Sequence, residues 1–201
     1  MRSKTFMTAV AAAGLLSGCA LLKSPPPVQT YRFGGLPAAA SAAPAGAPVQ
    51  VLLRRIEFPQ ATEGDKLLGV TGTETAYIKG ARWVSDARDL YTASLESAFA
   101  AQSSRVRLIG PREMTPATRA LALDVRAFEA RYAAPGAAPT VVVTVRARML
   151  TMPDRDVSAE QVFTVEQPAA ANRVSAIVDA FDIATRDLNA RIVAWTDASS
   201  R

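Results

Sequence analysis

Side chains able to carry out chemistry are few in this chain, which holds a single cysteine and no histidine. The lack of histidine excludes histidine-based nucleophilic catalysis, histidine metal sites and the commonest general base at neutral pH. Asp154 and Asp156 form a pair in a turn-rich segment, and Asp179 and Asp182 form another near the polar flank of a helical pattern. The Gly/Thr segment 69–73 lacks the lysine of a phosphate-binding loop. We therefore predict no catalytic residue, no metal site and no cofactor.

Cys19, the only thiol, follows a short basic start and an uncharged apolar run over residues 5–16. The run is too short to span a bilayer, which needs about twenty residues, but it suits the apolar part of a signal peptide. Leu16, Ser17 and Gly18 directly before Cys19 resemble the lipobox read by lipoprotein signal peptidase. We expect residues 1–18 to be cleaved and Cys19 to be acylated, so that lipid holds the chain on a membrane. An ordinary secretory signal that happens to contain a cysteine is the alternative.

The residue after the cysteine is Ala20, and alanine at this place resembles the default for sorting to the outer membrane, facing the periplasm. A lone thiol forms no internal disulfide, so the folded domain must depend on core burial. Removal of residues 1–18 takes away Arg2 and Lys4, so the net charge falls from +5 to +3, which is mild, and no lysine or arginine run resembles a nucleic-acid footprint. We therefore expect membrane lipid as the partner of Cys19 and no nucleic-acid partner.

Residues 19–48 are dominated by alanine, proline, serine and glycine, a composition that cannot bury enough apolar surface to fold alone. This segment is predicted to be the lipid anchor and a tether. One interruption, Tyr31-Arg32-Phe33, alternates bulky with charged side chains and predicts a short edge strand attached to the domain. The globular domain is predicted to occupy residues 49–198.

Two segments have the three- and four-residue apolar spacing of amphipathic helices. The first covers residues 85–102, with Ser85 or Asp86 as its N-cap, and the second is the stripe 174–195, with Asn172 as its N-cap. Extended patterns cover residues 49–58, 67–70, 75–79, 106–109 and three alternating runs near 121–127, 141–149 and 157–165. Turns between the last three runs predict an antiparallel meander. The predicted fold class is α+β, with a largely antiparallel sheet of four to six strands and two amphipathic helices packed on one face.

Alternation along the three long runs assigns one face of each strand to the core and the other to solvent. The core face of the first run would carry Leu121, Leu123, Val125 and Ala127. The outer face would carry arginines together with Phe128, Tyr132, Val142 and Leu150. The outer charges are opposite in sign on the last two runs, which favours their pairing as neighbours. The apolar side chains on this face either line a protein interface or belong to a partly covered sheet.

Segment 57–83, before the first predicted helix, is rich in apolar side chains and glycine. Such a segment is either folded over the core or offered to a partner. On the partner interpretation, the binding residues are Tyr31, Phe33, Phe58, Leu67, Leu68, Tyr77 and Trp83. The sheet edge at residues 31–33 could in addition accept a strand from another chain.

Four features stand in a characteristic order along the chain. The lipobox ending at Cys19 is followed by Tyr31-Arg32-Phe33, by a strand that ends at Ile56-Glu57-Phe58-Pro59, and by a helix led by Trp83. Further strands and a C-terminal helix complete the order. This order resembles the ABC-type transport auxiliary lipoprotein component family, known from paraquat-inducible-type transport systems, and the resemblance covers essentially the whole chain.

Two motifs depart from the pattern of that family. Its tyrosine-leucine-aspartate after the proline is replaced by Gln60-Ala61-Thr62, and its tryptophan-alanine-glutamate-proline helix start is replaced by Trp83-Val84-Ser85-Asp86. The resemblance implies a non-enzymatic auxiliary component of an envelope lipid-transport system. Its implied partner is a periplasm-spanning protein of the mammalian-cell-entry (MCE) type, docked at the outer membrane. A structural or assembly lipoprotein of the outer membrane, of the barrel-plug or peptidoglycan-associated type, and a lipid-anchored hydrolase are the alternatives.

Overall fold

The computed structural model describes residues 28–35 and 47–200. The predicted lipobox (Leu16, Ser17 and Gly18) and the predicted lipidation site, Cys19, lie outside the described residues. Cleavage and acylation therefore stay predictions, as do the boundaries of signal peptide, tether and domain.

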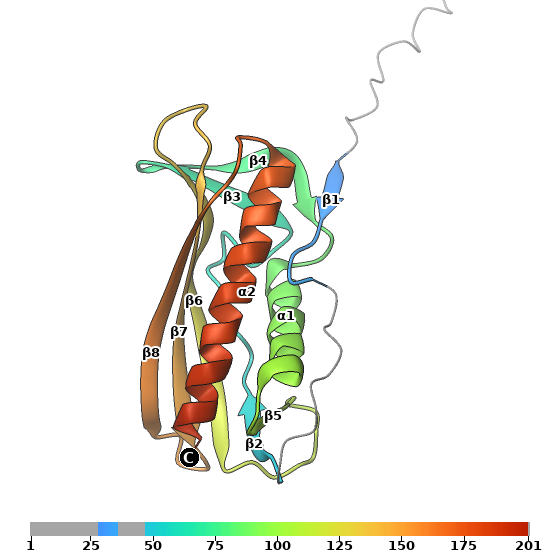
Figure 1. The fold of residues 1–201 in the computed structure, drawn as a ribbon, viewed down its shortest axis with the longest axis vertical. Helices are drawn as coiled ribbons and strands as arrows, with labels where there is room; N and C mark the ends of the chain where they lie inside the picture. Colours follow the sequence, from blue (N-terminus) through green and yellow to red (C-terminus); the bar gives the residue numbers. More distant parts are fainter. Residues whose placement is uncertain (1–27, 36–46, 201) are drawn as a thin grey trace, which may run out of the picture.

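Two helices, α1 (Ala87–Gln102) and α2 (Val174–Ser199), lie side by side on one face of the sheet (Figure 1). This confirms both predicted helices and the face they share. Asp86 occupies the N-cap position of α1, as predicted, whereas Arg173 rather than Asn172 occupies that of α2. Neither cap makes a side-chain hydrogen bond. The helices are therefore stabilised mainly by burial of their apolar faces.

Eight strands form a single sheet built around β6, which has 14 residues. One edge of β6 pairs with β7 along its length, and β7 pairs in turn with β8. The other edge of β6 is shared, because its first residues pair with β2 and its last with β3. The sheet therefore forks into a β2–β5 branch and a β3–β4–β1 branch. The strands are β1 (Gln29–Tyr31), β2 (Val49–Leu53), β3 (Lys66–Thr71), β4 (Glu74–Trp83), β5 (Val106–Ile109), β6 (Arg119–Tyr132), β7 (Thr140–Thr151) and β8 (Val157–Pro168).

The sheet is mixed and has eight strands, which corrects the prediction of a largely antiparallel sheet with four to six. The meander β6–β7–β8 is antiparallel, as predicted, but β1–β4, β2–β5, β2–β6 and β3–β6 are parallel pairs. Between β2 and β5 the chain passes through β3, β4 and α1. A crossover connection of this length brings the second strand back in the same direction as the first.

A β-bulge in β6 corrects the predicted outer face. The register of β6 against β7 shifts between Val125 and Ala127, so that one extra residue reverses the alternation beyond it. As a result Phe128 lies in the helix-side core, 2 % exposed, and Tyr132 packs against that core. Two other residues predicted to offer apolar surface, Val142 and Leu150, are only 3 % and 4 % exposed.

Candidate interaction surfaces

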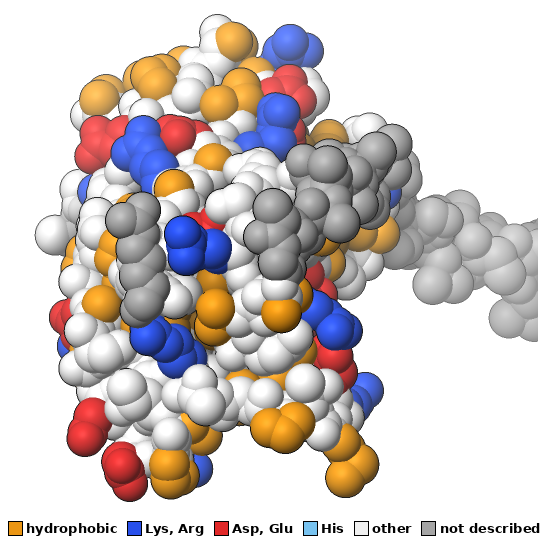
Figure 2. All heavy atoms as spheres, turned by 60° about the horizontal axis from the view of Figure 1, so that its bottom comes forward, with side chains coloured by type: hydrophobic (Ala, Val, Ile, Leu, Met, Phe, Trp, Pro, Cys, Tyr) orange, Lys and Arg blue, Asp and Glu red, His pale blue; other side chains and the backbone are white. Residues whose placement is uncertain are grey.

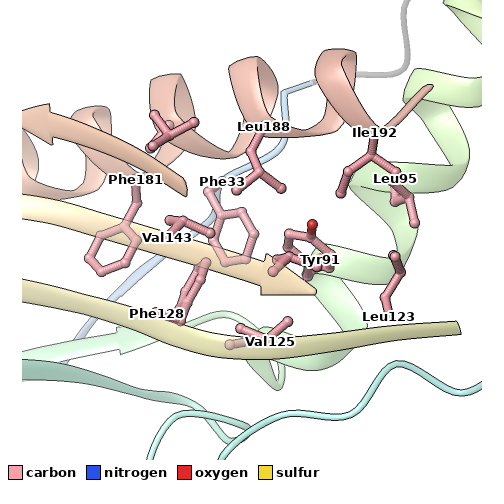
Figure 3. Close-up of a cluster of buried hydrophobic side chains, with 14 of the residues drawn as sticks. Phe33, Tyr91, Leu95, Leu123, Val125, Phe128, Val143, Phe181, Leu188 and Ile192 are labelled. Carbon is pink, nitrogen blue, oxygen red and sulfur yellow. The ribbon is translucent and has the colours of Figure 1, made fainter. Parts of the chain in front are cut away.

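An aromatic cluster closes the β3–β4–β1 branch of the sheet. The ring centroid of Phe33 lies 4.9 Å from that of Trp83 and 5.2 Å from that of Phe128. Phe181 of α2 completes the cluster, 5.4 Å from Trp83 and 4.8 Å from Phe128. Figure 3 shows Phe33, Phe128 and Phe181 pointing toward one another between α2 and the sheet. All four side chains are buried, so the cluster stabilises the fold by apolar burial and ring contacts.

Residues 28–35, called the strap below, carry Phe33 into this cluster. The strap begins with β1, which is an edge strand and pairs in parallel with the end of β4. The backbone N–H of Val84 also donates to the carbonyl oxygen of Tyr31, at 2.7 Å. The predicted edge strand is thus confirmed at Tyr31, but the strand ends there, and Phe33 lies in the core.

Gly34 fixes the strap between the two helices. Its φ is +91°, a conformation that side chains with a Cβ rarely adopt, and an added Cβ would lie 2.6 Å from Ser94 Cβ of α1. Its backbone N–H donates to Asp182 Oδ1 of α2 at 2.8 Å. The strap is therefore bonded to β4 on one side and held against both helices on the other.

Most of the predicted partner-binding residues belong to the core. Phe33, Leu67, Leu68 and Trp83 are each less than 9 % exposed, and Phe58 and Tyr31 pack against the core cluster. Their burial favours the core interpretation of segment 57–83 and corrects the partner interpretation for the buried side chains. Tyr77 alone among the seven keeps a large exposed area, 47 %, with Lys66 Nζ 4.7 Å from its ring centroid. It stays a predicted contact.

The sheet face opposite the helices carries charges that pair with one another. Arg146 of β7 donates to Glu160 of β8 at 2.7 Å, which agrees with the predicted pairing of opposite charges on these strands. This hydrogen bond holds the pKa of the Glu160 carboxyl below its usual value. Arg126 and Asp124 form a second pair on β6 at 2.6 Å. Because these pairs are partly exposed to solvent, they contribute little stability.

The β2–β5 branch ends beside a cavity of about 480 Å³ between α1 and β5. Its lining includes Phe99 of α1, Val106 and Leu108 of β5, and Pro48 before β2. Three charged side chains also line it: Glu96 of α1, Glu113 after β5 and Arg107 of β5. A volume of this size with mostly apolar walls and a few polar groups is typical of ligand-binding cavities.

The two carboxylates at this cavity differ in their partners. Glu113 accepts hydrogen bonds from Gly110 N at 3.0 Å and from Arg107 Nη2 at 3.2 Å. Burial and the neighbouring charge of Glu113 raise the pKa of the Glu96 carboxyl above its ordinary value. Because Arg107 pairs with Glu113, the negative charge presented beside the apolar wall is that of Glu96.

No pattern in the sequence marks this cavity, because its carboxylates come from separate elements that only the fold brings together. No group of three or more His, Cys, Asp or Glu side chains within the described segments is arranged to hold a metal ion. In the same segments neither helix is long and apolar enough to cross a membrane.

Comparisons with known proteins agree with this fold. Protein XCC0632 of Xanthomonas campestris, of family DUF330, is similar with a TM-score of 0.68 and 25 % identity, covering 80 % of this chain and 93 % of that one. A hypothetical protein of Chlamydia trachomatis, CT253, shares the fold with a TM-score of 0.52 and 12 % identity, over 77 % of this chain and 98 % of that one. No curated protein sequence matches this one. The model of the ABC-type transport auxiliary lipoprotein component family matches residues 31–193, so the chain belongs to that family.

Proposed function

We propose that this protein is an outer-membrane-anchored lipoprotein that docks a periplasm-spanning, MCE-type conduit of an ABC-type intermembrane lipid transport system. Membership of the auxiliary lipoprotein family carries the proposal. The auxiliary role requires binding and positioning, and the protein performs it without catalysing a reaction. Lipid on Cys19 would hold the domain at the membrane, and the folded part would contact the conduit.

The dimensions of the chain support this division of labour. Eight residues, 20–27, separate Cys19 from Val28, the first described residue, so covalent geometry limits the distance between them to about 30 Å. The strap that starts at Val28 lies toward the end of the molecule opposite β5 (Figure 1). Helix α2, with 26 residues, runs along the long axis between these ends and is about 39 Å long. The β5 end can therefore stand well away from the membrane surface, where an approaching conduit would meet it.

Co-purification tests the proposal. The full-length, tagged lipoprotein is extracted from envelopes in mild detergent, and the bound proteins are identified by mass spectrometry. We expect an MCE-type protein to be recovered, and Cys19→Ala to lose sedimentation with outer membranes while it still captures that protein in detergent. Recovery of a barrel protein without any MCE-type protein would instead favour the assembly lipoprotein and contradict the proposal.

A further inference from the structure

We propose that the β5 end is a peptide-binding site, which takes an extended segment of a partner protein carrying a lysine or arginine flanked by apolar residues. The segment would pair with the open edge of β5 and place its basic side chain in the cavity beside Glu96. This inference deepens the proposed docking function and rests on it only for the identity of the partner.

The edge of β5 supplies the backbone groups for strand addition. Among the described strands, β5 pairs with β2 alone, in parallel, with Val106 opposite Val49 and Leu108 opposite Val51. Alternate residues of a parallel strand direct their backbone groups to the same neighbour, and Val49 N donates to Arg105 O. Arg107 and Ile109 therefore bond toward β2, which leaves the N–H and C=O of Leu108 directed to the open edge. An exposed edge of this kind is the template used in peptide recognition by strand addition.

The cavity beside this edge supplies side-chain selectivity. Its wall of Phe99, Val106 and Leu108 favours an aliphatic stem, and Glu96 favours a positive charge at its tip. A lysine or arginine side chain has both properties, because its apolar stem can be buried while its charged end reaches a carboxylate. Glu113 is already bonded to Gly110 and Arg107, whereas no hydrogen bond or ion pair is found for Glu96 within the described part of the chain. Glu96 is therefore the carboxylate open to a ligand.

The surroundings of the cavity fit a protein partner. Met114, next to Glu113, is fully exposed and adds apolar surface at this end. Figure 2, which turns the end with β5 toward the viewer, shows apolar side chains interspersed with basic and acidic ones. A lipid amine would match Glu96 but has no strand backbone to pair with β5, so the edge favours a peptide.

The binding test uses the full mature chain and a synthetic octapeptide of alternating valine and threonine with one central lysine, labelled with a fluorophore. Fluorescence anisotropy measures the dissociation constant. We expect saturable binding, and little binding of the matching peptide with a central glutamate. Methylation of the peptide nitrogens that face β5 should abolish binding, whereas methylation of the alternate nitrogens should leave it unchanged. Glu96→Gln should weaken binding about two- to fivefold, the range expected for a partly exposed ion pair.

Glu74→Gln is the matched control, because Glu74 is exposed and lies at the β3–β4 turn, far from β5 in Figure 1. It should leave the dissociation constant unchanged. Equal binding of the lysine and glutamate peptides, or no effect of either methylation pattern, would overturn the proposal. Two results together would also overturn it: phosphatidylethanolamine vesicles displace the peptide completely, and the same vesicles bind Glu96→Gln more weakly than the unchanged protein. Peptide binding without recovery of an MCE-type protein would leave the site standing and contradict the proposed function alone.

Discussion

The β3–β4–β1 branch ends in a strap that inserts Phe33 among buried aromatic rings, whereas the β2–β5 branch ends in an open strand beside a cavity of about 480 Å³. Both branches pair with the same edge of β6. The first branch is filled by residues that precede the domain in sequence. No strand or side chain of the described residues fills the second. We therefore expect the first branch to contribute mainly stability and the second to contribute binding.

Removing Phe33 should have the largest effect on stability. Phe33→Ala leaves a void next to Trp83 and Phe128, and a buried phenylalanine lost in this way costs about 3–5 kcal/mol. Tyr77→Ala, which truncates an exposed aromatic of the same branch, should cost less than about 1 kcal/mol. Urea unfolding of the two variants measures the difference. Equal losses of unfolding free energy in the two variants would show that the strap does not stabilise the β3–β4–β1 branch.

Substitutions at Gly34 and Gly35 distinguish a steric clash from backbone strain. Gly34→Ala meets both the positive φ and the contact with Ser94, and should cost about 2–4 kcal/mol. Gly35→Ala is the matched control, since Gly35 also has a positive φ of +65° but nothing within 4 Å of an added Cβ. It should cost about 1 kcal/mol. Thermal unfolding compares them, and an equal cost would argue against a strap wedged between the helices.

Asp197 ties the end of α2 to the turn before β5. Burial alone would raise the pKa of its carboxyl, but hydrogen bonds from Ser103 Oγ at 2.6 Å and Ser104 N at 2.8 Å together hold the pKa below the ordinary 3.8. The folded pKa is the lower one, so this stabilisation is present above about pH 4 and is lost as the pH falls through the folded value. Asp197→Asn should cost about 1–2 kcal/mol at pH 7 and less at pH 3, because the stabilisation declines as the pH falls below about 4. Unfolding curves at both pH values check this, and a cost independent of pH would contradict it.

Glu96→Gln should have the smallest effect on stability, and of opposite sign. Burial and the charge of Glu113 raise the folded pKa of Glu96, so its ionisation opposes folding as the pH rises through the glutamate range. The variant should gain roughly 0.2–0.5 kcal/mol at pH 7, allowing for solvent screening, and nothing at pH 3. A loss of stability at pH 7 would show that the Glu96 carboxylate stabilises the fold, which would argue against a carboxylate that is free to bind a ligand.

Local patterns in the sequence predict the elements well but not the way they are joined. The stripe of α2 follows from its spacing, and the short strand 106–109 is marked by the Gly110-Pro111 that closes it. The bulge after Val125 does not, because one extra residue in a strand leaves no mark in composition yet moves Phe128 from the outer face into the core. Parallel pairing is also invisible, since alternation does not record the direction of a neighbouring strand.

The candidate sites follow the same rule. Apolar residues such as Phe33 and Trp83 are recognisable in the sequence as important, but their role depends on whether another segment covers them, which only the fold decides. Glu96 and Glu113 lie on different elements, and the residues next to each of them in sequence form no recognisable motif. Their meeting at the end of β5 results from the crossover that returns the chain beside β2.

Site-specific photo-crosslinking in intact cells tests most directly whether the β5 end receives the conduit. A photoreactive amino acid replaces Arg107, which is exposed on β5, or Tyr77, which is exposed on the β3–β4–β1 branch. We expect a crosslink to an MCE-type protein from position 107 and not from position 77. A crosslink to that protein from position 77 alone would contradict docking at the β5 end. It would instead place the contact on segment 57–83.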